Sequence, residues 1–232
     1  MIAVHLPSRS FADILTLDQS YLPYLTLAAQ AQAGVYQGQS FAIGLTGQLE
    51  QIQVVLFRQP SATQDVQFYV FQMQGNAATN IYGVTIPYQT IPIGADGNNL
   101  PSNYPATYVN TMLSVNLATL NILVEKGQEW GFAVTSNIVG GNPQIDLFYG
   151  CENNMGSSHC GSPPTFDGYL GGSSIEFTDF GAITTYPIQN VAFQTYVLPE
   201  PVPGPIVGAG PPGLVAACVG LLAWWRRQRK AA

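Results

Sequence analysis

The chain has 232 residues, of which 47% are apolar and only 9% are charged, and its formal net charge is -6. A typical soluble domain has about 25% charged residues, so the polar surface here must come from Gln, Asn, Ser and Thr. Residues 13–198 contain only two basic residues, Arg58 and Lys126, against 12 acidic ones. Such a body lacks the basic face that phosphate groups require, which excludes nucleic-acid binding.

The first 12 residues are interpreted as the end of a signal peptide or as a disordered start. They contain no basic start followed by an apolar core, which a complete signal peptide would need. The stretch Ser10, Phe11, Ala12 fits the small-x-small pattern of a signal cleavage site. We therefore expect the true start, with its signal, to lie upstream of Met1.

Short runs with apolar residues at every second position extend from about residue 35 to residue 197. In the first of them Phe41, Ile43 and Leu45 share one face. A period of two predicts strands that bury one face. The predicted strands cover residues 40–45, 49–59, 66–74, 111–117, 129–136, 144–150 and 191–197.

Clusters of Gly, Pro, Asn and Ser separate these runs, and the longest predicted loops cover residues 75–110 and 151–190. Residues 24–33 are the one segment with a helical pattern, and nothing provides the repeated helical crossovers of a parallel sheet. The sequence predicts an all-β fold, a jelly-roll-like antiparallel β-sandwich, over residues 13–197.

Two cysteines enclose the segment CENNMGSSHC, whose Asn, Ser and Gly residues allow it to loop back. We predict a disulfide between Cys151 and Cys160 in an oxidising compartment, where such a bridge adds about 2 to 3 kcal/mol of stability. Two free thiols in the cytosol are the alternative. His159 does not complete a zinc site, because no second pair of ligands has zinc spacing.

Carboxylates offer two kinds of chemistry. A pair could serve a glycosidase, but no spacing selects one, so solvated loop charges explain them better and we predict that the protein is not an enzyme. The oxygen-rich loops around Asp96 and Glu152 could instead bind calcium, although Asx-turns explain both equally well. The candidate catalytic carboxylates are Asp146, Glu152, Asp167, Glu176 and Asp179.

Tyrosines are abundant, with 12 in the chain, and could form a surface on which sugar rings stack. The alternative is that they fill the rim of the core with the hydroxyl facing water. The candidates for a glycan-binding surface are Tyr36, Tyr69, Tyr82, Tyr88, Tyr104, Tyr108, Tyr149 and Tyr169.

The C-terminal end contains 20 consecutive uncharged residues, 206–225, which as a helix would span about 30 Å, the thickness of the hydrocarbon core. A helix buried in the sandwich is disfavoured, because two adjacent prolines and four glycines would destabilise it. We predict a single transmembrane helix, with residues 226–232 held in the cytoplasm by the positive-inside rule. The membrane stop signal is Arg226, Arg227, Arg229 and Lys230.

A proline-rich linker at residues 198–205 precedes this span and contains Pro199, Glu200 and Pro201. The order of a Pro-Glu-Pro motif, an apolar span and a terminal Arg cluster resembles the PEP-CTERM sorting signal of Gram-negative bacteria. The segments GQSFAIGLTGQLEQIQVVLFR and VAFQTYVLPEP are also similar to the β-sandwich domains that often precede such tails. The resemblance implies cleavage near residues 199–201 by an exosortase in the inner membrane, often in lineages that make extracellular polysaccharide.

These observations predict an exported, non-catalytic β-sandwich protein. It would be an inner-membrane precursor and then reach the cell surface or the biofilm matrix, where glycan is its candidate ligand and calcium its only candidate cofactor. Two alternatives remain: a secreted carbohydrate-active enzyme, and a protein permanently anchored by its tail.

Overall fold

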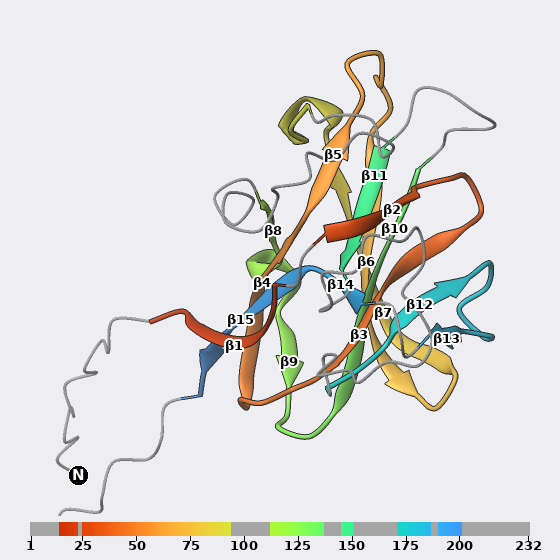
Figure 1. Cartoon of the computed structure of the whole chain (residues 1–232). Helices are drawn as coiled ribbons and strands as arrows, with labels where there is room; N and C mark the ends of the chain where they lie inside the picture. Colours follow the sequence, from red (N-terminus) through yellow and green to blue (C-terminus); the bar gives the residue numbers. More distant parts are fainter. Residues whose placement is uncertain are drawn as a thin grey trace, which may run out of the picture. The chain divides into compact units, whose positions relative to one another are not determined.

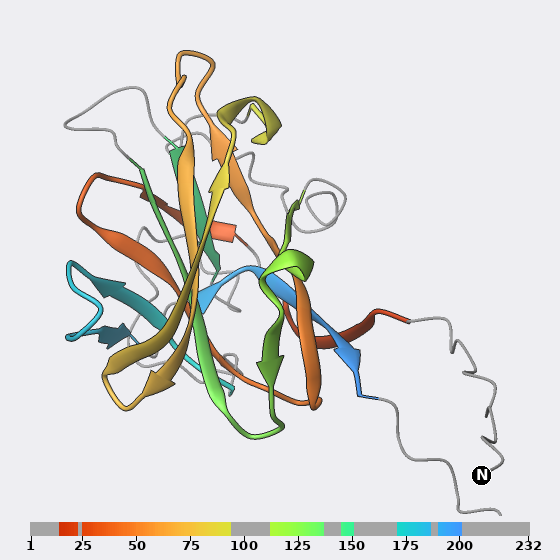
Figure 2. The ribbon, with the colours of Figure 1, turned by 180° about the vertical axis from the view of Figure 1, so that it is seen from behind.

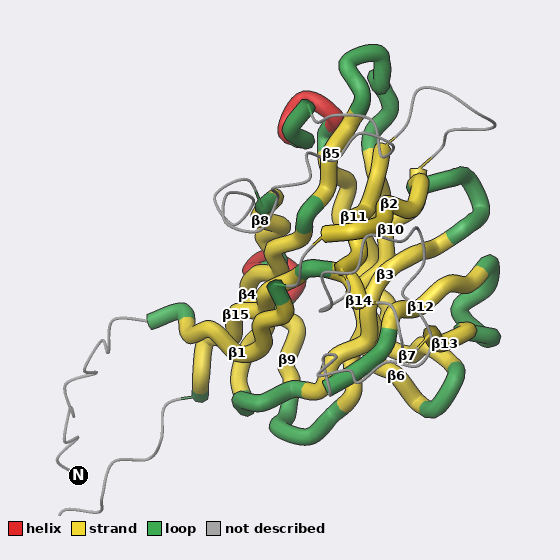
Figure 3. The backbone as a smooth tube through the Cα atoms, in the orientation of Figure 1, coloured by secondary structure: helices red, strands yellow, loops and turns green. Residues whose placement is uncertain are grey.

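The computed structural model describes residues 14–22, 25–93, 112–136, 145–150, 171–186 and 190–200, without the side chains of residues 25–30, 146 and 148–150. The described part consists of strands and two short 3-10 helices, η1 and η3 (Figures 1 and 3). The elements are β1 (Thr16–Tyr21), β2 (Leu25–Gln30), β3 (Tyr36–Ala42), β4 (Gly47–Val54), β5 (Leu56–Arg58), β6 (Val66–Gln74), β7 (Ala77–Ile86), η1 (Tyr88–Thr90), β8 (Leu113–Asn116), η3 (Ala118–Leu120), β9 (Ile122–Val124), β10 (Glu129–Ser136), β11 (Ile145–Gly150), β12 (Ser174–Phe177), β13 (Thr184–Tyr186), β14 (Asn190–Val191) and β15 (Phe193–Pro199).

The strands form three antiparallel sheets. A six-stranded sheet has the order β13-β12-β3-β10-β6-β7, and a five-stranded sheet has the order β1-β15-β4-β8, with β9 also paired to β4. The third sheet, β14-β11-β2 with β5 on β11, continues from the five-stranded one, because β4 leads directly into β5 and β14 leads directly into β15. At the two junctions the N–H of Val55 donates to the carbonyl of Ala192.

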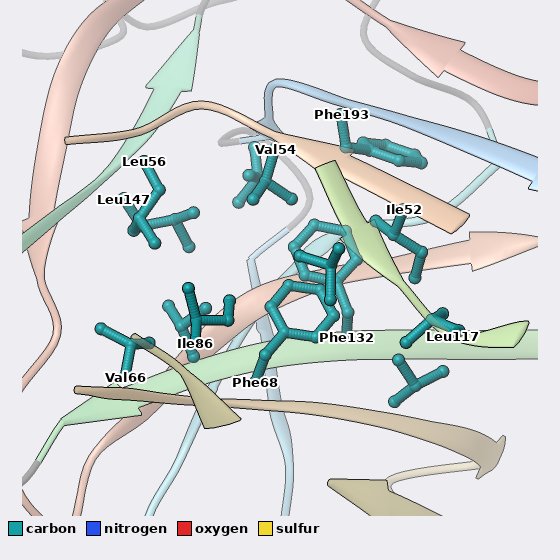
Figure 4. Packing of buried hydrophobic residues seen from close by; sticks show 14 of the residues in the cluster. Ile52, Val54, Leu56, Val66, Phe68, Ile86, Leu117, Phe132, Leu147 and Phe193 are labelled. Carbon is teal, nitrogen blue, oxygen red and sulfur yellow. The ribbon is translucent and has the colours of Figure 1, made fainter. Parts of the chain in front are cut away.

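The hydrophobic core lies between the six-stranded sheet and the sheets that face it. Ile52, Val54 and Phe193 point from one side towards Phe68 and Phe132 on the other (Figure 4). The rings of Phe68 and Phe132 stack with centroids 5.5 Å apart, and Phe193 lies 5.7 Å from Phe132. Each fully buried Phe side chain contributes about 1.5 to 3 kcal/mol relative to an exposed one. The prediction of an all-β, sandwich-like fold is therefore confirmed.

Strand β1 is fixed beside β15 by an aspartate. The register shifts between Leu17 and Gln19, so that Asp18 is the extra residue of a β-bulge. Both oxygens of its carboxylate accept the N–H of Gly44, at 3.0 and 3.2 Å. The bulge therefore ties β1 to the turn between β3 and β4. Figure 2 shows the ribbon from behind, with β1 running beside β15.

The structure corrects two expectations. Residues 24–33, the segment with a helical pattern, contain strand β2, which pairs with β11 from Leu25 to Gln30. The helix propensity of its Leu, Ala and Gln residues is outweighed by the backbone hydrogen bonds that an adjacent strand offers. The predicted loops at residues 75–110 and 151–190 also contain strands, namely β7, β12 and β13.

Candidate functional site

Strand β15 brings the chain to the predicted sorting motif. It lies between β1 and β4, and its last paired residues are Leu198 opposite Gln48 and Pro199 opposite Gly47. The strand includes Leu198 and Pro199, which the sequence assigned to the linker. A proline has no N–H to donate to a neighbouring strand, so Pro199 is a natural last residue for β15.

The end of β15 requires a glycine on the neighbouring strand. A methyl group added at Gly47 would overlap the carbonyl oxygen of Leu198 and crowd the Cα of Pro199. Gly47 itself is buried, and a side chain at this position would push the two strands apart. The close approach of β4 to the end of β15 therefore depends on a glycine at position 47.

The first two residues of the motif are accessible. Pro199 and Glu200 are both exposed, and the chain divides into two units between them. Pro201, the predicted transmembrane residues 206–225 and the basic stop signal at 226–230 lie outside the described residues. Among the described residues, no helix is long and apolar enough to cross a membrane.

A second candidate is a cluster of aromatic rings on the six-stranded sheet, on the face opposite the main core. Tyr36 stacks on Phe177 with centroids 4.9 Å apart and planes inclined by 5°. Phe180, from the turn between β12 and β13, lies 4.8 Å from Tyr36 and 5.4 Å from Tyr69. The ring of Phe71 meets Phe177 edge-on at 5.6 Å. These five residues are called the aromatic cluster below.

Glycines on neighbouring strands leave room for two rings of the aromatic cluster. A methyl group at Gly131 would come within 2.8 Å of the Phe71 ring, and one at Gly83 within 3.3 Å of the Tyr69 ring. The turn between β12 and β13 covers the rings, and the carbonyl of Phe180 accepts the N–H of Ala78 at 2.8 Å. The cluster is thus a second small core.

The surroundings of Tyr36 act on its hydroxyl group. Burial, and to a lesser extent the neighbouring Tyr69, raises the pKa of Tyr36 above its ordinary value. Both tyrosines are half-buried, and several rings contact each of them. This packing matches the alternative in which tyrosines fill the rim of a core, and it leaves little free ring face for a sugar.

The remaining predicted tyrosines do not join this cluster. Tyr82 stacks on Trp130 with centroids 6.4 Å apart, and the guanidinium of Arg58 lies 5.4 Å from the centre of the Tyr88 ring. The structure places Tyr149 on β11 without describing its side chain. Tyr104, Tyr108 and Tyr169 lie outside the described residues.

Of the five candidate carboxylates, the structure describes the side chains of two. Glu176 Oε2 accepts a hydrogen bond from Gln37 Nε2 at 3.2 Å, and Asp179 Oδ1 accepts the N–H of Gly181 at 3.1 Å. The first contact joins β12 to its neighbour β3, and the second lies within the turn between β12 and β13. Asp146 lies on β11 without a described side chain, and Glu152 and Asp167 fall outside the described residues.

The predicted disulfide and calcium loops cannot be placed in this fold. Cys151, Cys160, His159, Asp96 and Glu152 all lie outside the described residues. Among the residues that are described, no group of three or more His, Cys, Asp or Glu side chains could hold a metal ion.

Comparison with known proteins adds no family to these observations. No family model matches the chain, and no curated protein matches its sequence.

Proposed function

We propose that this protein is an exported, non-catalytic β-sandwich protein whose C-terminal tail sorts it to the cell surface or to the extracellular polysaccharide matrix. In the precursor, residues 206–225 form a transmembrane helix in the inner membrane, and Arg226, Arg227, Arg229 and Lys230 hold its end in the cytoplasm. The partner is an exosortase-type enzyme that recognises Pro199, Glu200 and Pro201 and cleaves nearby.

One observation carries this proposal: the folded body ends where the motif begins. Strand β15 ends at Pro199, the chain divides between Pro199 and Glu200, and both residues are exposed. A processing enzyme needs an accessible segment that it can bind in an extended form. Cleavage after Pro199 would leave all the paired residues of β15 in the body.

We further assign the fold to the jelly-roll-like class. Successive strands alternate between the two sides of the core: β3 belongs to the six-stranded sheet, β4 to the facing sheet, β6 and β7 to the six-stranded sheet again, and β8 to the facing one. The same alternation continues from β10 to β15. Such crossing between layers is typical of jelly rolls.

The test is co-expression of the full chain, with a secretion signal added before Met1, with and without an exosortase in a Gram-negative host. We expect the exosortase to remove the tail near residues 199–201, which intact mass measurement of the product would reveal. An unchanged mass in the presence of an exosortase that processes a reference substrate would overturn the proposal. In that case the tail is a permanent anchor.

Two variants identify the recognised feature. Glu200→Gln should block processing, because it removes the only charge of the motif. Glu129→Gln is the matched control, since Glu129 is also an exposed glutamate but begins strand β10. Processing that is equally slow in both variants would mean that the motif is not what the enzyme recognises.

A further inference from the structure

The outer face of the five-stranded sheet carries rows of uncharged hydrogen-bonding side chains. The pairing of β1, β15, β4 and β8 aligns four residues across the sheet: Ser20 opposite Gln194, Gln194 opposite Gln53, and Gln53 opposite Ser114. None of them is buried, whereas their sequence neighbours Tyr21, Phe193, Val54 and Val115 face the core. Amides and hydroxyls thus form one continuous row.

A second row runs parallel to the first. Here Leu17, an exposed apolar residue at the edge of the row, lies opposite Tyr196, Tyr196 lies opposite Gln51, and Gln51 lies opposite Asn116. The two rows are separated by two residues, about 7 Å, along β15, β4 and β8, and by three residues along β1, where Asp18 is the extra residue of the bulge. Neighbouring strands lie about 4.8 Å apart. This grid, called the amide face below, is wide enough to contact several units of an extended polymer.

Hydrogen bonds within the amide face orient its groups without using all of them. Gln194 Nε2 donates to Ser20 Oγ at 3.2 Å, and the hydroxyl of Tyr196 donates to Gln194 Oε1 at 3.3 Å. Gln51 and Ser114 make no side-chain hydrogen bond with any residue that the structure describes. The amide of Gln51 and the hydroxyl of Ser114 therefore offer donors and acceptors to an external partner.

The charges around the amide face select the kind of partner. The four strands β1, β15, β4 and β8 contain no basic residue, and their acidic residues are Asp18 and Glu50. Asp18 is engaged by Gly44, and Glu50 is the extra residue where the β15–β4 register shifts. On these four strands an anionic polymer would meet two carboxylates and no basic side chain.

We infer that the amide face binds an uncharged polysaccharide. Sugar hydroxyls are donors and acceptors at once, so amide and hydroxyl side chains can pair with them without exposing an unmatched charge. The ring of Tyr196, near the centre of the grid, provides an apolar surface for a sugar ring. The inference rests on the proposed export, which is what brings the protein to such a polymer.

The test measures binding of the purified full chain to cellulose, β-1,3-glucan and galactomannan, with alginate as the anionic polymer. The full chain includes the proposed transmembrane helix and is therefore purified in detergent. This detergent must lack a sugar headgroup, because a glycoside would compete for the amide face. We expect binding to at least one neutral polymer and none to alginate. Binding to alginate alone, or to no polymer, would overturn the inference.

Variants locate the site on the amide face. Gln51→Ala should weaken binding about tenfold without changing the thermal stability, because Gln51 makes no structural hydrogen bond with the described residues. The double change Gln53→Ala with Gln194→Ala should abolish it. The matched control is Gln67→Ala with Thr85→Ala, an amide–hydroxyl pair joined at 3.1 Å on the six-stranded sheet. Equal losses in both double variants would contradict the inference.

A second copy of the chain is the rival occupant. Sedimentation at several concentrations distinguishes the two, because self-association that Gln51→Ala abolishes would assign the face to a dimer and overturn the inference.

The binding test and the processing test are independent, because binding is measured on the unprocessed chain and processing is measured by mass. A failure of polysaccharide binding therefore leaves the sorting proposal intact, and a failure of processing leaves the binding result intact.

Discussion

The side chain of Gln39 joins the two sides of the core through Asn190. Its Nε2 donates to Asn190 Oδ1 at 3.0 Å and to the carbonyl of Ser40 at 3.0 Å, and its Oε1 accepts the N–H of Val191 at 2.9 Å. Gln39 lies on β3 and Asn190 on β14, so this buried amide connects sheets on opposite sides of the core. Every polar atom of the Gln39 side chain is paired.

Replacing Gln39 should therefore be costly. Gln39→Met keeps the volume but leaves Asn190 Oδ1 and the N–H of Val191 without their buried partner, and we expect a loss of about 1 to 3 kcal/mol in the free energy of unfolding. Urea denaturation measures it. A double-mutant cycle with Asn190→Ala should give a coupling energy of at least about 0.5 kcal/mol. Additive effects would mean that the two amides act independently.

The bulge residue Asp18 should make stability depend on pH. Burial raises its pKa above the ordinary value, although the N–H groups of Gly44 and Leu45 oppose the shift. The folded state therefore holds the proton more tightly than the unfolded state. This contribution to stability is fully present below the unfolded pKa and is lost as pH rises through the folded one.

Asp18→Asn cannot titrate and provides the reference. The free energy of unfolding of the natural protein minus that of the variant should increase as pH is lowered from 7 to 3, as followed by urea denaturation at each pH. A difference that decreases over this interval would mean that the ionised form is favoured.

The aromatic cluster should contribute to stability in proportion to burial. Phe71 is fully buried, so Phe71→Ala should cost about 3 to 5 kcal/mol in the free energy of unfolding. Phe180 is half-buried, and Phe180→Ala should cost roughly half of that. Near-ultraviolet circular dichroism of both variants would show the lost ring packing. An unchanged free energy of unfolding in Phe180→Ala would mean that the β12–β13 turn does not hold the aromatic cluster together.

Gly47 should be sensitive to the smallest substitution. Gly47→Ala places a methyl group against the carbonyl of Leu198, and we expect a loss of about 1 to 3 kcal/mol in thermal or urea unfolding. Gly181→Ala is the control, because its added methyl group would meet only ordinary contacts, at 3.7 Å or more from Asp179. Similar stabilities of the two variants would contradict the close approach of β4 and β15.

Several strands could be predicted because apolar residues recur at every second position over most of their length. Residues 66–74 and 129–136, for example, were predicted as strands and form β6 and β10. Strand β7 was missed because its uncharged Thr, Asn and Gly residues resemble a loop, and Asn80 adopts a positive φ of 47°. Pairing with β6 decides its conformation, and a single sequence does not reveal that pairing.

The sorting motif and the amide face also differ in how far the sequence alone predicts them. The motif at residues 199–201 is contiguous, so its residues can be recognised directly, and its order relative to the apolar span carries the hypothesis. The amide face could not be predicted, because Ser20, Gln53, Ser114 and Gln194 become neighbours only through the register of four strands. Alternation in β4 and β15 indicated only that their glutamines face away from the core.

The most direct test of the sorting proposal is the mass of the mature protein isolated from the cells that make it. We predict a C-terminus within residues 199–201 and a body without the apolar tail. Recovery of a C-terminus at Ala232 in mature, surface-located protein would contradict processing at the motif.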